Sequence, residues 1–359
     1  MVQLRLDAQA RFRRDAWIEI NLNHLEYNIQ SLYAEFKMPL MPVLKADAYG
    51  HGATVIAQIL DSYDFIYAYG VASADEALTL RQATNKKIVI LGISPEWSLE
   101  QLLEHNIDIT IASLEAAVKL NDLAKKKNQQ ASIHIKLDTG MNRIGFAHEE
   151  NINLFKTLTN LHIESIFTHF ADPYNLEFSL QQKQYFEKSA QGFSCLKHPG
   201  SSPALRLVPG LSADIVRVGI ELYGLENPKL KPLLSLYSRI SFVKKINAGE
   251  TVSYKLNWQA QQETYIATLP LGYADGLTRA LSNKLLGYCK GQVIKQVGNI
   301  TMDQVMFDLG LDTDIKVGDV VEIIGPHRSV SEWAKAANTI SYEIVCNLNL
   351  RLPKTYTRD

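Results

Sequence analysis

Short apolar runs alternate with longer amphipathic stretches from residue 16 to about residue 224. Apolar residues at spacings of three and four predict helices at 23–36, 53–60, 74–82, 99–104, 114–127 and 180–190. The apolar runs predict strands at 42–44, 65–71, 88–92, 107–112, 132–137, 163–168, 197–199 and 215–219. Eight strands with a helix in nearly every gap fit a TIM-type (β/α)8 barrel, because parallel strands need crossover connections. A doubly wound open sheet shares this alternation and is the structural alternative.

After residue 228 the pattern changes to short strand-like segments broken by Gly and Asn. Strands are predicted at 240–243, 250–254, 264–269, 292–297, 304–309 and 319–324, with one helix at 330–338. Asn-Pro and Lys-Pro pairs interrupt any regular element between residues 225 and 236. We therefore predict an N-terminal barrel at 15–230 and a C-terminal mainly β domain at 231–359. Residues 1–14 form an N-terminal extension that we expect to associate with the β domain.

Composition indicates a soluble globular protein, with small molecules as the default partners. The 359 residues are 46% hydrophobic and 21% charged, which is ordinary for a globular chain with a sizeable core. A formal net charge of -1 provides no field for nucleic acid or acidic membranes. Without an apolar run long enough for a signal peptide or a membrane span, we expect a cytoplasmic protein. The cysteines, Cys195, Cys289 and Cys346, lack metal or redox spacing and are interpreted as core thiols in a reducing compartment.

The most informative stretch is PVLKADAYGHG at 42–52, where a predicted strand ends at Lys45. A lysine in apolar surroundings has a lowered pKa, and its neutral amine can attack a carbonyl to form a Schiff base. Tyr49 lies beside Gly50 and Gly52, which allow the backbone to approach an anion at a helix start. An aldehyde-binding lysine next to a phosphate site suggests pyridoxal phosphate. Taken alone, a lysine at a strand end is more often a solvated surface charge.

Further strings follow strand ends along the chain. IKLDTGMNRIG at 135–145 has two cations, and a pairing of one of them with Asp138 is the simplest interpretation. THFAD at 168–172 contains His169, although a lone histidine is usually a packed or surface group. HPGSSP at 198–203 and IVRVGIELYG at 215–224 combine small or glycine residues with strand and helix ends, which suits phosphate. An acidic series at residues 308–319 does not have the spacing of a calcium loop, so no metal is expected.

Four more strings complete the set: GETVSY at 249–254, LGYADG at 271–276, GNITMDQ at 298–304 and SYE at 341–343. Together, all these strings closely resemble those of the alanine racemase family. They occur in the family's order over nearly the whole chain. The resemblance implies an amino-acid racemase that binds pyridoxal 5′-phosphate and interconverts L- and D-alanine, which a bacterium needs for peptidoglycan. The implied assembly is a homodimer with active sites shared across the interface.

The resemblance also implies a role for each matching residue. Lys45 and Tyr254 are the implied catalytic groups, one on each face of the substrate. The implied cofactor ligands are Lys45, Tyr49, Ser202, Arg217, Gly219, Ile220 and Tyr342. The implied substrate contacts are Arg143, Tyr273 and Met302. The implied supporting residues are His169, below the cofactor ring, and Lys136, which is carbamylated in many family members and then holds the arginine.

Arg217 has a mechanistic consequence under this interpretation. A guanidinium hardly ever gives up its proton, so the ring nitrogen that it contacts stays unprotonated and withdraws electrons less strongly. Proton exchange is then favoured over transamination. Racemisation needs an acid-base group on each face of Cα, and Tyr254 is expected to come from the partner subunit.

Three alternatives remain open at this stage. A racemase for another amino acid, such as serine or lysine, would use the same fold. An amino-acid decarboxylase would need an acidic residue in place of Arg217. A non-catalytic pyridoxal carrier would keep Lys45 but has no need of Tyr254 or of a second domain.

Overall fold

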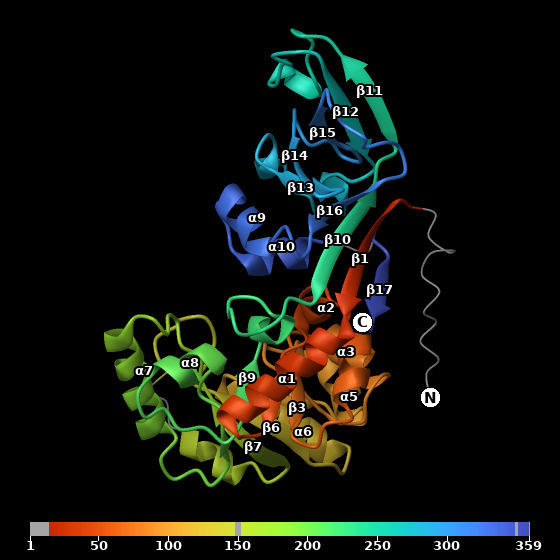
Figure 1. The fold of residues 1–359 in the computed structure, drawn as a ribbon. Coiled ribbons are helices and arrows are strands. Elements are labelled where there is room, and N and C mark those ends of the chain that lie inside the picture. Colours follow the sequence, from red (N-terminus) through yellow and green to blue (C-terminus); the bar gives the residue numbers. More distant parts are fainter. Residues whose placement is uncertain (1–13, 148–151, 349–350, 359) are drawn as a thin grey trace. The chain divides into compact units, whose positions relative to one another are not determined.

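The computed structural model describes residues 14–147, 152–348 and 351–358, which form two compact units (Figure 1). The barrel unit comprises residues 29–48 and 52–222, and the β unit comprises the described residues of 1–28, 49–51 and 223–359. This division differs from the predicted one, which placed 15–28, 49–51 and 223–230 in the barrel. The predicted N-terminal extension lies outside the described residues except for Arg14.

Parallel strands close into a barrel in the barrel unit. In the described part of the chain there are eight: β2 (Leu40–Pro42), β3 (Ala68–Val71), β4 (Lys87–Ile90), β5 (Asp108–Ile111), β6 (Ala131–Lys136), β7 (Leu161–Phe167), β8 (Leu196–Lys197) and β9 (Val216–Val218). Strands β3 to β8 pair in chain order, and β2 pairs with β9. Bridges from Val43 to Gly70 and from Ser201 to Arg217 join the two sheets at both sides. The ring is thereby closed, which confirms the predicted barrel and excludes the open sheet.

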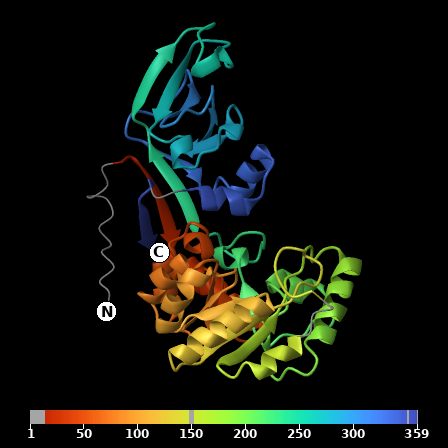
Figure 2. The ribbon, with the colours of Figure 1, turned by 180° about the vertical axis from the view of Figure 1, so that it is seen from behind.

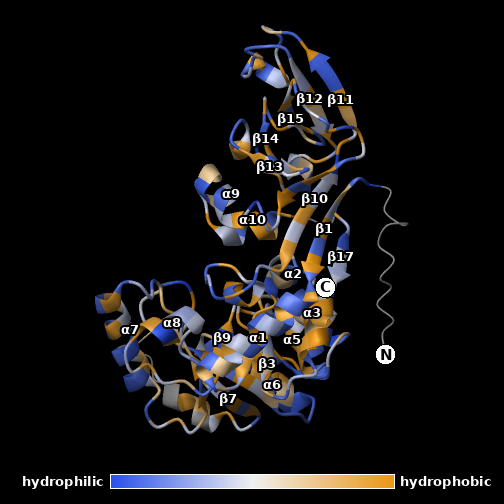
Figure 3. Ribbon diagram, viewed as in Figure 1, coloured by the Kyte–Doolittle hydropathy of each residue, from blue (hydrophilic) through white to orange (hydrophobic). Residues whose placement is uncertain are grey.

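Helices cover the outside of the strands, as Figure 2 shows for α6 and α7. Their bounds are α1 (Leu22–Phe36), α3 (Ala53–Leu60), α4 (Ala74–Arg81), α5 (Leu99–Glu104), α6 (Leu114–Lys126), α7 (Leu176–Ser189) and α8 (Ser202–Leu207). The 3₁₀ turns are η2 (Glu96–Ser98), η3 (Ile152–Thr157) and η4 (Ile220–Tyr223). Helix α6 illustrates the local cause: Ser113 caps its first turn, and Ala117, Leu120 and Ala124 form its buried stripe. Helix α3 is almost wholly apolar (Figure 3).

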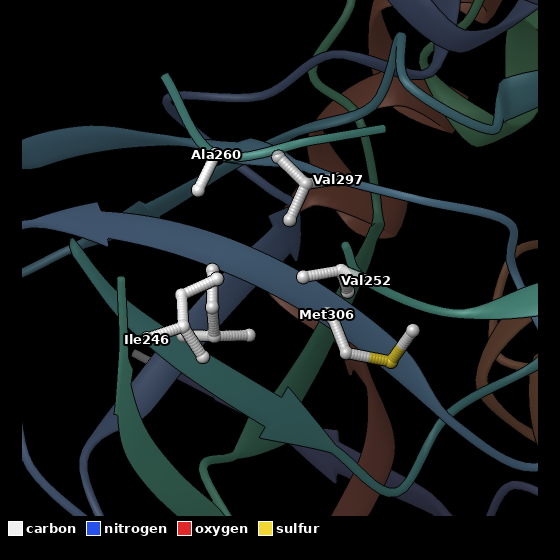
Figure 4. Close-up of a cluster of buried hydrophobic side chains, with 6 residues drawn as sticks. Ile246, Val252, Ala260, Val297 and Met306 are labelled. Atoms are coloured by element: carbon white, nitrogen blue, oxygen red, sulfur yellow. The ribbon is translucent and has the colours of Figure 1, made fainter. Parts of the chain in front are cut away.

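The β unit is built on one sheet of nine strands within the described residues. Their order is β11-β12-β15-β14-β13-β16-β10-β1-β17. The bounds are β1 (Ala16–Asn21), β10 (Leu234–Arg239), β11 (Phe242–Ile246), β12 (Thr264–Leu269), β13 (Leu286–Cys289), β14 (Gln292–Gln296), β15 (Val305–Gly310), β16 (Val320–Ile324) and β17 (Lys354–Thr357). The predicted mainly β second domain is thus confirmed. One apolar cluster, shown in Figure 4, packs around Ile246, Val252 and Met306.

The first strand of the chain belongs to this second sheet. β1 pairs antiparallel with β10 and parallel with β17, so segments more than 200 residues apart form one ladder. Its buried residues alternate, with Ala16, Ile18 and Ile20 fully buried. The alternation is visible in the sequence, but it does not say which distant strand is the partner. For this reason the β unit takes up residues that the sequence pattern assigned to the barrel.

Three other expectations differ from the structure. The predicted strand at 250–254 is a turn that leads into η5 (Tyr254–Leu256), and the remaining short elements of the β unit are η6 (Tyr273–Asp275) and η7 (Arg279–Leu281). Helix α9 (Val330–Ala337) matches the predicted helix, but α10 (Ser341–Asn347) follows it and was not predicted. Of the three cysteines, Cys289 is buried whereas Cys346 is exposed on α10, so the interpretation as core thiols is wrong for Cys346. Among the described residues, no helix has the length and apolar character needed to cross a bilayer.

Candidate active site

Lys45 lies at the carboxyl end of the first barrel strand. Val43 and Leu44 still take part in barrel pairing, through backbone hydrogen bonds of 2.8 Å to Val218 and 2.7 Å to Gly70. Lys45 is the next residue. The carboxyl ends of the strands form the face on which barrel enzymes have their active sites.

The four residues that follow this lysine have a left-handed backbone, with φ between 52° and 55°. This conformation costs about 1–2 kcal/mol for each residue that is not glycine. Two carboxylates hold the turn: Ala46 N–H donates to Glu76 Oε1 at 2.8 Å, and Ala53 N–H donates to Asp47 Oδ1 at 2.8 Å. Backbone strain of this kind persists where the surroundings enforce it, and it concentrates at functional sites.

The side chain of Lys45 is exposed, so the expected apolar environment is wrong. The left-handed turn begins directly after it. Its charge nevertheless acts on the barrel, because Lys45 is one of the cations that lower the pKa of His169. Burial is the largest cause of that shift, followed by Arg217.

Basic residues gather at this face of the barrel, and we call Lys45, Lys136, Arg143, His169 and Arg217 the cation cluster. His169 is its neutral member, because its pKa lies well below the usual value. Burial lowers the pKa of Lys136 well below its usual value, and the charges of Arg217 and Arg143 lower it further. Burial also lowers the pKa of Arg217 to about 9, which leaves it charged at neutral pH. Buried like charges repel one another, so this arrangement is suited to an anionic ligand.

Arg217, on β9, is held in a fixed orientation. Its Nη1 donates to Nδ1 of His198 at 2.7 Å and also to the carbonyl oxygen of His198. Its Nη2 donates to the carbonyl oxygen of Thr168 at 2.7 Å and to Nδ1 of His169 at 3.4 Å. The ring of Phe167 lies 5.3 Å from the guanidinium carbon and 4.8 Å from Nζ of Lys136. The planar donors of Arg217 are thus immobilised by strand ends and strand-end loops.

Ser202 provides a buried hydroxyl close in sequence to His198, which contacts Arg217. It is the first residue of α8, is 1% exposed, and its Oγ has no hydrogen-bond partner among the described residues. The neighbouring bridge between Ser201 and Arg217 ties this turn to β9. Gly219 and Ile220 follow β9 directly and lead into η4. A buried hydroxyl without a partner is costly unless a ligand accepts its hydrogen bond.

In the β unit, Tyr49 belongs to a group of aromatic rings. Its ring lies 5.1 Å from that of Tyr223 and 6.0 Å from that of Tyr342, and the His51 ring stacks on Tyr223 at 4.5 Å. Gly50 allows this packing, because a Cβ on it would lie 2.4 Å from a backbone oxygen of α10. Residues 49–51 therefore pack with α10, which explains why the structure assigns them to the β unit.

Tyr254 is presented on a strained turn. Ser253, Lys255 and Leu256 all have positive φ, between 51° and 69°. Asn299 holds the turn from within: its Nδ2 donates to the carbonyl oxygen of Tyr254 at 2.7 Å, and its own carbonyl oxygen accepts from Ser253 Oγ at 2.7 Å. The Tyr254 side chain is 72% exposed. The β unit thus displays this phenol on its surface.

Tyr273 and Met302 lie on two turns that are joined by backbone hydrogen bonds. Tyr273 N–H donates to the carbonyl oxygen of Thr301 at 2.9 Å, and Ala274 N–H donates to that of Met302 at 3.0 Å. A Cβ at Gly272 would lie 2.3 Å from the Met302 oxygen, so only glycine permits this approach. Because Asn299 is three residues before Met302, one short segment positions the turns that carry Tyr254 and Tyr273.

The predicted site residues therefore form two groups. The barrel unit holds Lys45, Lys136, Arg143, His169, Ser202, Arg217, Gly219 and Ile220. The β unit holds Tyr49, Tyr254, Tyr273, Met302 and Tyr342.

Sequence reasoning missed several residues that organise these groups. His198 and Glu76 contact the barrel site, while Asn299 and Tyr223 organise the β unit. His198 and Asn299 lie within strings that were singled out, HPGSSP and GNITMDQ, so a polar residue inside a family-like string was an available signal. Glu76 had none, because its carboxylate acts from the first turn of α4, thirty residues from its partner Ala46.

The barrel is closed and has the cation cluster at the carboxyl ends of its strands, and the β unit displays a tyrosine. This combination is typical of an enzyme for small anionic substrates. Models of two domains match the chain: the alanine racemase N-terminal domain over residues 20–227 and the alanine racemase C-terminal domain over residues 233–356. The chain belongs to the alanine racemase family and is an isomerase.

Similar proteins support this assignment over nearly the full length. "Alanine racemase 1" of Oceanobacillus iheyensis is 37% identical, over 96% of this chain and 98% of the relative. The structure of alanine racemase from Clostridium difficile 630 is 33% identical with a TM-score of 0.90, and covers 97% of both chains. That of alanine racemase from Bartonella henselae with covalently bound pyridoxal phosphate is 30% identical with a TM-score of 0.87, over 96% and 99% of the two chains. The predicted family and racemase activity are thereby confirmed.

Proposed function

We propose that this protein interconverts L-alanine and D-alanine, with pyridoxal 5′-phosphate at Lys45 and proton transfer by two residues. The cation cluster carries the proposal. Buried Lys136 and Arg217, with Arg143 nearby, form a positive site that a phosphorylated cofactor and an amino-acid carboxylate would neutralise. The relatives named alanine racemase favour alanine as the substrate.

Residues of this chain fit the cofactor. The unpartnered Oγ of Ser202 is suited to a phosphate oxygen, together with the backbone at Gly219 and Ile220. Arg217 would contact the ring nitrogen, because strand ends and strand-end loops hold its guanidinium in place. When bound, the cofactor would hold the amino group of the substrate and withdraw electrons from Cα.

Two further tyrosines complete the proposed phosphate contacts. Tyr49 and Tyr342 have neighbouring rings in the β unit, so their phenols are presented together. A phenol donates well to a phosphate oxygen and remains neutral at physiological pH.

The substrate carboxylate needs an orienting cation. Arg143 is exposed in the loop after β6, where it can reach a ligand while the buried charge of Lys136 stays behind it. Carbamylation of Lys136 would convert its repulsion of Arg143 into an attraction, because the modified side chain is negative. Met302 would contact the carboxylate through its backbone, and Tyr273 would line the entrance.

Proton transfer requires one group on each face of Cα. We assign the Lys45 amine to one face and the Tyr254 phenol of the partner subunit to the other. The high exposure of Tyr254, at 72%, supports this assignment, since a surface phenol on a rigid turn can serve a second chain. The homodimer therefore follows from the chemistry.

The alternatives remain less favoured. A decarboxylase would require an acidic partner for the ring nitrogen, whereas this chain offers Arg217. A pyridoxal carrier has no need of a strained turn that presents Tyr254. Serine and lysine differ from alanine in the size and polarity of the side chain, so both are tested directly as substrates. A cytoplasmic role in supplying D-alanine for peptidoglycan remains part of the proposal.

The first experiment tests substrate and chemistry together. Purified protein with added pyridoxal phosphate is incubated with L-alanine, L-serine or L-lysine in deuterated water, followed by chiral analysis. We expect D-alanine with deuterium at Cα and much slower conversion of the other two. Faster conversion of serine or lysine would mean that the protein is a racemase for that amino acid. No conversion of any of the three would refute the proposed racemase activity.

The second experiment tests the shared site. Lys45→Ala and Tyr254→Phe proteins are each nearly inactive, but refolded together they form mixed dimers in which one site has both native residues. We expect about a quarter of the wild-type activity, since about half of the dimers are mixed and each has one intact site of two. Lys126→Ala, an exposed lysine on α6, replaces Lys45→Ala in the control mixture and should form dimers that keep an intact site. Absence of complementation would place both bases in the same chain.

A further inference from the structure

A continuous chain of hydrogen bonds runs through the barrel interior from the site arginine. Arg217 Nη1 lies 2.7 Å from Nδ1 of His198, and Nε2 of His198 lies 2.7 Å from Ser165 Oγ. Ser165 Oγ lies 2.5 Å from Nδ1 of His134, and Nε2 of His134 lies 3.2 Å from Asp108 Oδ2. All five residues are buried, with at most 5% of any of them exposed.

The chemistry of the two ends sets the direction of every bond. Arg217 can only donate, so Nδ1 of His198 accepts and Nε2 of His198 carries the ring proton. Ser165 accepts that proton and donates its own to Nδ1 of His134. His134 then donates from Nε2 to the Asp108 carboxylate, which can only accept.

The protonation of His198 agrees with this direction. Burial lowers the pKa of His198 well below its usual value, and the charge of Arg217 lowers it further. His198 is therefore neutral and has one ring proton. Its ring is also fixed in place, because it stacks on Phe167 at 4.6 Å.

The chain follows the construction of the barrel. Asp108 is on β5, His134 on β6, Ser165 on β7, His198 directly after β8, and Arg217 on β9. The pairing of His134 with Ser165 in the β6–β7 register brings the middle of the chain together. Five successive strands or strand ends thus each contribute one member.

This chain of hydrogen bonds compensates for the burial of the charged Arg217 guanidinium. A buried guanidinium without a counter-charge is unfavourable, and the described residues place no carboxylate in an ion pair with Arg217. Aligned hydrogen bonds polarise one another, so a distant carboxylate can act through neutral residues.

We infer that Asp108, His134 and Ser165 are positioning residues for the reaction, which act through His198 to hold Arg217 charged and correctly oriented toward the cofactor ring. This inference rests on the proposed function. None of the three belongs to the cation cluster, and their effect reaches the site only through the hydrogen-bond chain.

The variants Asp108→Ala and Asp108→Asn separate this role from general packing. Loss of the acceptor in Asp108→Ala should lower kcat by about 10- to 100-fold, the effect of removing a hydrogen bond to a charged group, with KM for alanine nearly unchanged. Asp108→Asn keeps an acceptor oxygen but loses the negative charge, so it should recover only part of the loss. Thr110→Val, a buried neighbour on β5 whose hydroxyl has no partner among the described residues, is the matched control and should resemble wild type.

A second readout responds to the arginine alone. If Arg217 is displaced, the ring nitrogen can take up a proton, and transamination increases: the amino group of alanine passes to the cofactor, which leaves pyridoxamine phosphate and releases pyruvate. We expect the ratio of pyruvate release to racemisation to rise about 10-fold in Asp108→Ala and in Ser165→Ala. A purely structural role would lower the thermal stability without a change in this ratio.

The third readout needs neither cofactor nor activity. In 15N-histidine NMR spectra of the cofactor-free wild-type protein, His198 should carry its proton on Nε2, with the signal assigned through His198→Asn. A proton on Nδ1 would overturn the inference, as would kinetics in which both Asp108 variants match Thr110→Val. If the wild-type protein neither racemises alanine nor binds the cofactor, the proposed function fails, and the spectrum still tests the direction of the chain.

Discussion

In the barrel unit, Arg217 and Lys136 are buried and held by neighbouring strands, whereas in the β unit Tyr254 and Met302 are 72% and 53% exposed. The barrel residues are therefore positioned before any ligand arrives. The β-unit residues are rigid at the backbone, through Asn299 and the turn at Gly272, but their side chains face outward. Under the proposed function, the barrel supplies the charges and the exposed tyrosine serves the site of a partner chain.

Among the variants, Lys45→Ala should cause the largest loss of activity, because the barrel would lose both its proposed cofactor attachment and one proposed base. We expect racemase activity to fall by at least roughly 1000-fold and the visible absorbance of the bound cofactor to disappear. Lys126→Ala, which removes an exposed lysine from α6, should leave both unchanged. Retained absorbance in Lys45→Ala would assign the attachment to another amine.

Tyr254→Phe removes the acid-base group of the β unit and leaves the barrel intact. Racemisation should fall by about 100-fold or more, while cofactor absorbance stays normal. In deuterated water, one enantiomer of alanine should still exchange its Cα proton without inversion, because Lys45 can still serve its own face. Equal loss of exchange from both enantiomers would contradict a base that acts on one face.

The buried histidines of the barrel predict a pH dependence of stability. The pKa values of His169 and His198 are held well below 6.5 by burial first and by Arg217 next. The unfolded chain binds protons at these positions before the folded chain does. Their contribution is therefore complete above 6.5 and is lost as the pH falls toward the folded pKa, by about 1.4 kcal/mol per pH unit for each histidine.

Urea unfolding of the cofactor-free protein at about pH 7 and about pH 5.5 measures this slope. The variant His198→Asn should remove about half of it. His105→Asn, at an exposed position after α5, should leave it unchanged. A slope that both variants leave intact would place the titrating groups elsewhere.

Asn299→Ala should have the smallest effect, because it loosens the Tyr254 turn without removing the phenol. The substitution removes the hydrogen bond from Nδ2 to the carbonyl oxygen of Tyr254 and keeps the one from Ser253 Oγ, which goes to the backbone of residue 299. We expect kcat to fall by about 2- to 10-fold and cofactor binding to stay unchanged. Asn257→Ala, which removes a contact to the Asn299 side chain alone, is the milder comparison. Larger losses in Asn257→Ala than in Asn299→Ala would contradict the assignment.

The sequence by itself determined the barrel and most of its helices, because apolar spacing at three and four residues is a local property. Helix α3 at Ala53–Leu60 and strand β12 at Thr264–Leu269 have their predicted bounds for this reason. The family-like strings also identified residues that now gather at one face of the barrel, such as Lys45, His169 and Arg217.

Only the tertiary structure decided features that depend on distant segments. Strand β1 joined the second sheet because its partners lie more than 200 residues away. Lys45 is exposed, and the left-handed turn that follows it is held by Glu76 from a helix thirty residues away. The buried chain from Arg217 to Asp108 arose because closure of the barrel brings together five strands or strand ends, each of which contributes a single polar residue. Local spacing specifies what each element is, but the environment of a charge depends on which other elements pack around it.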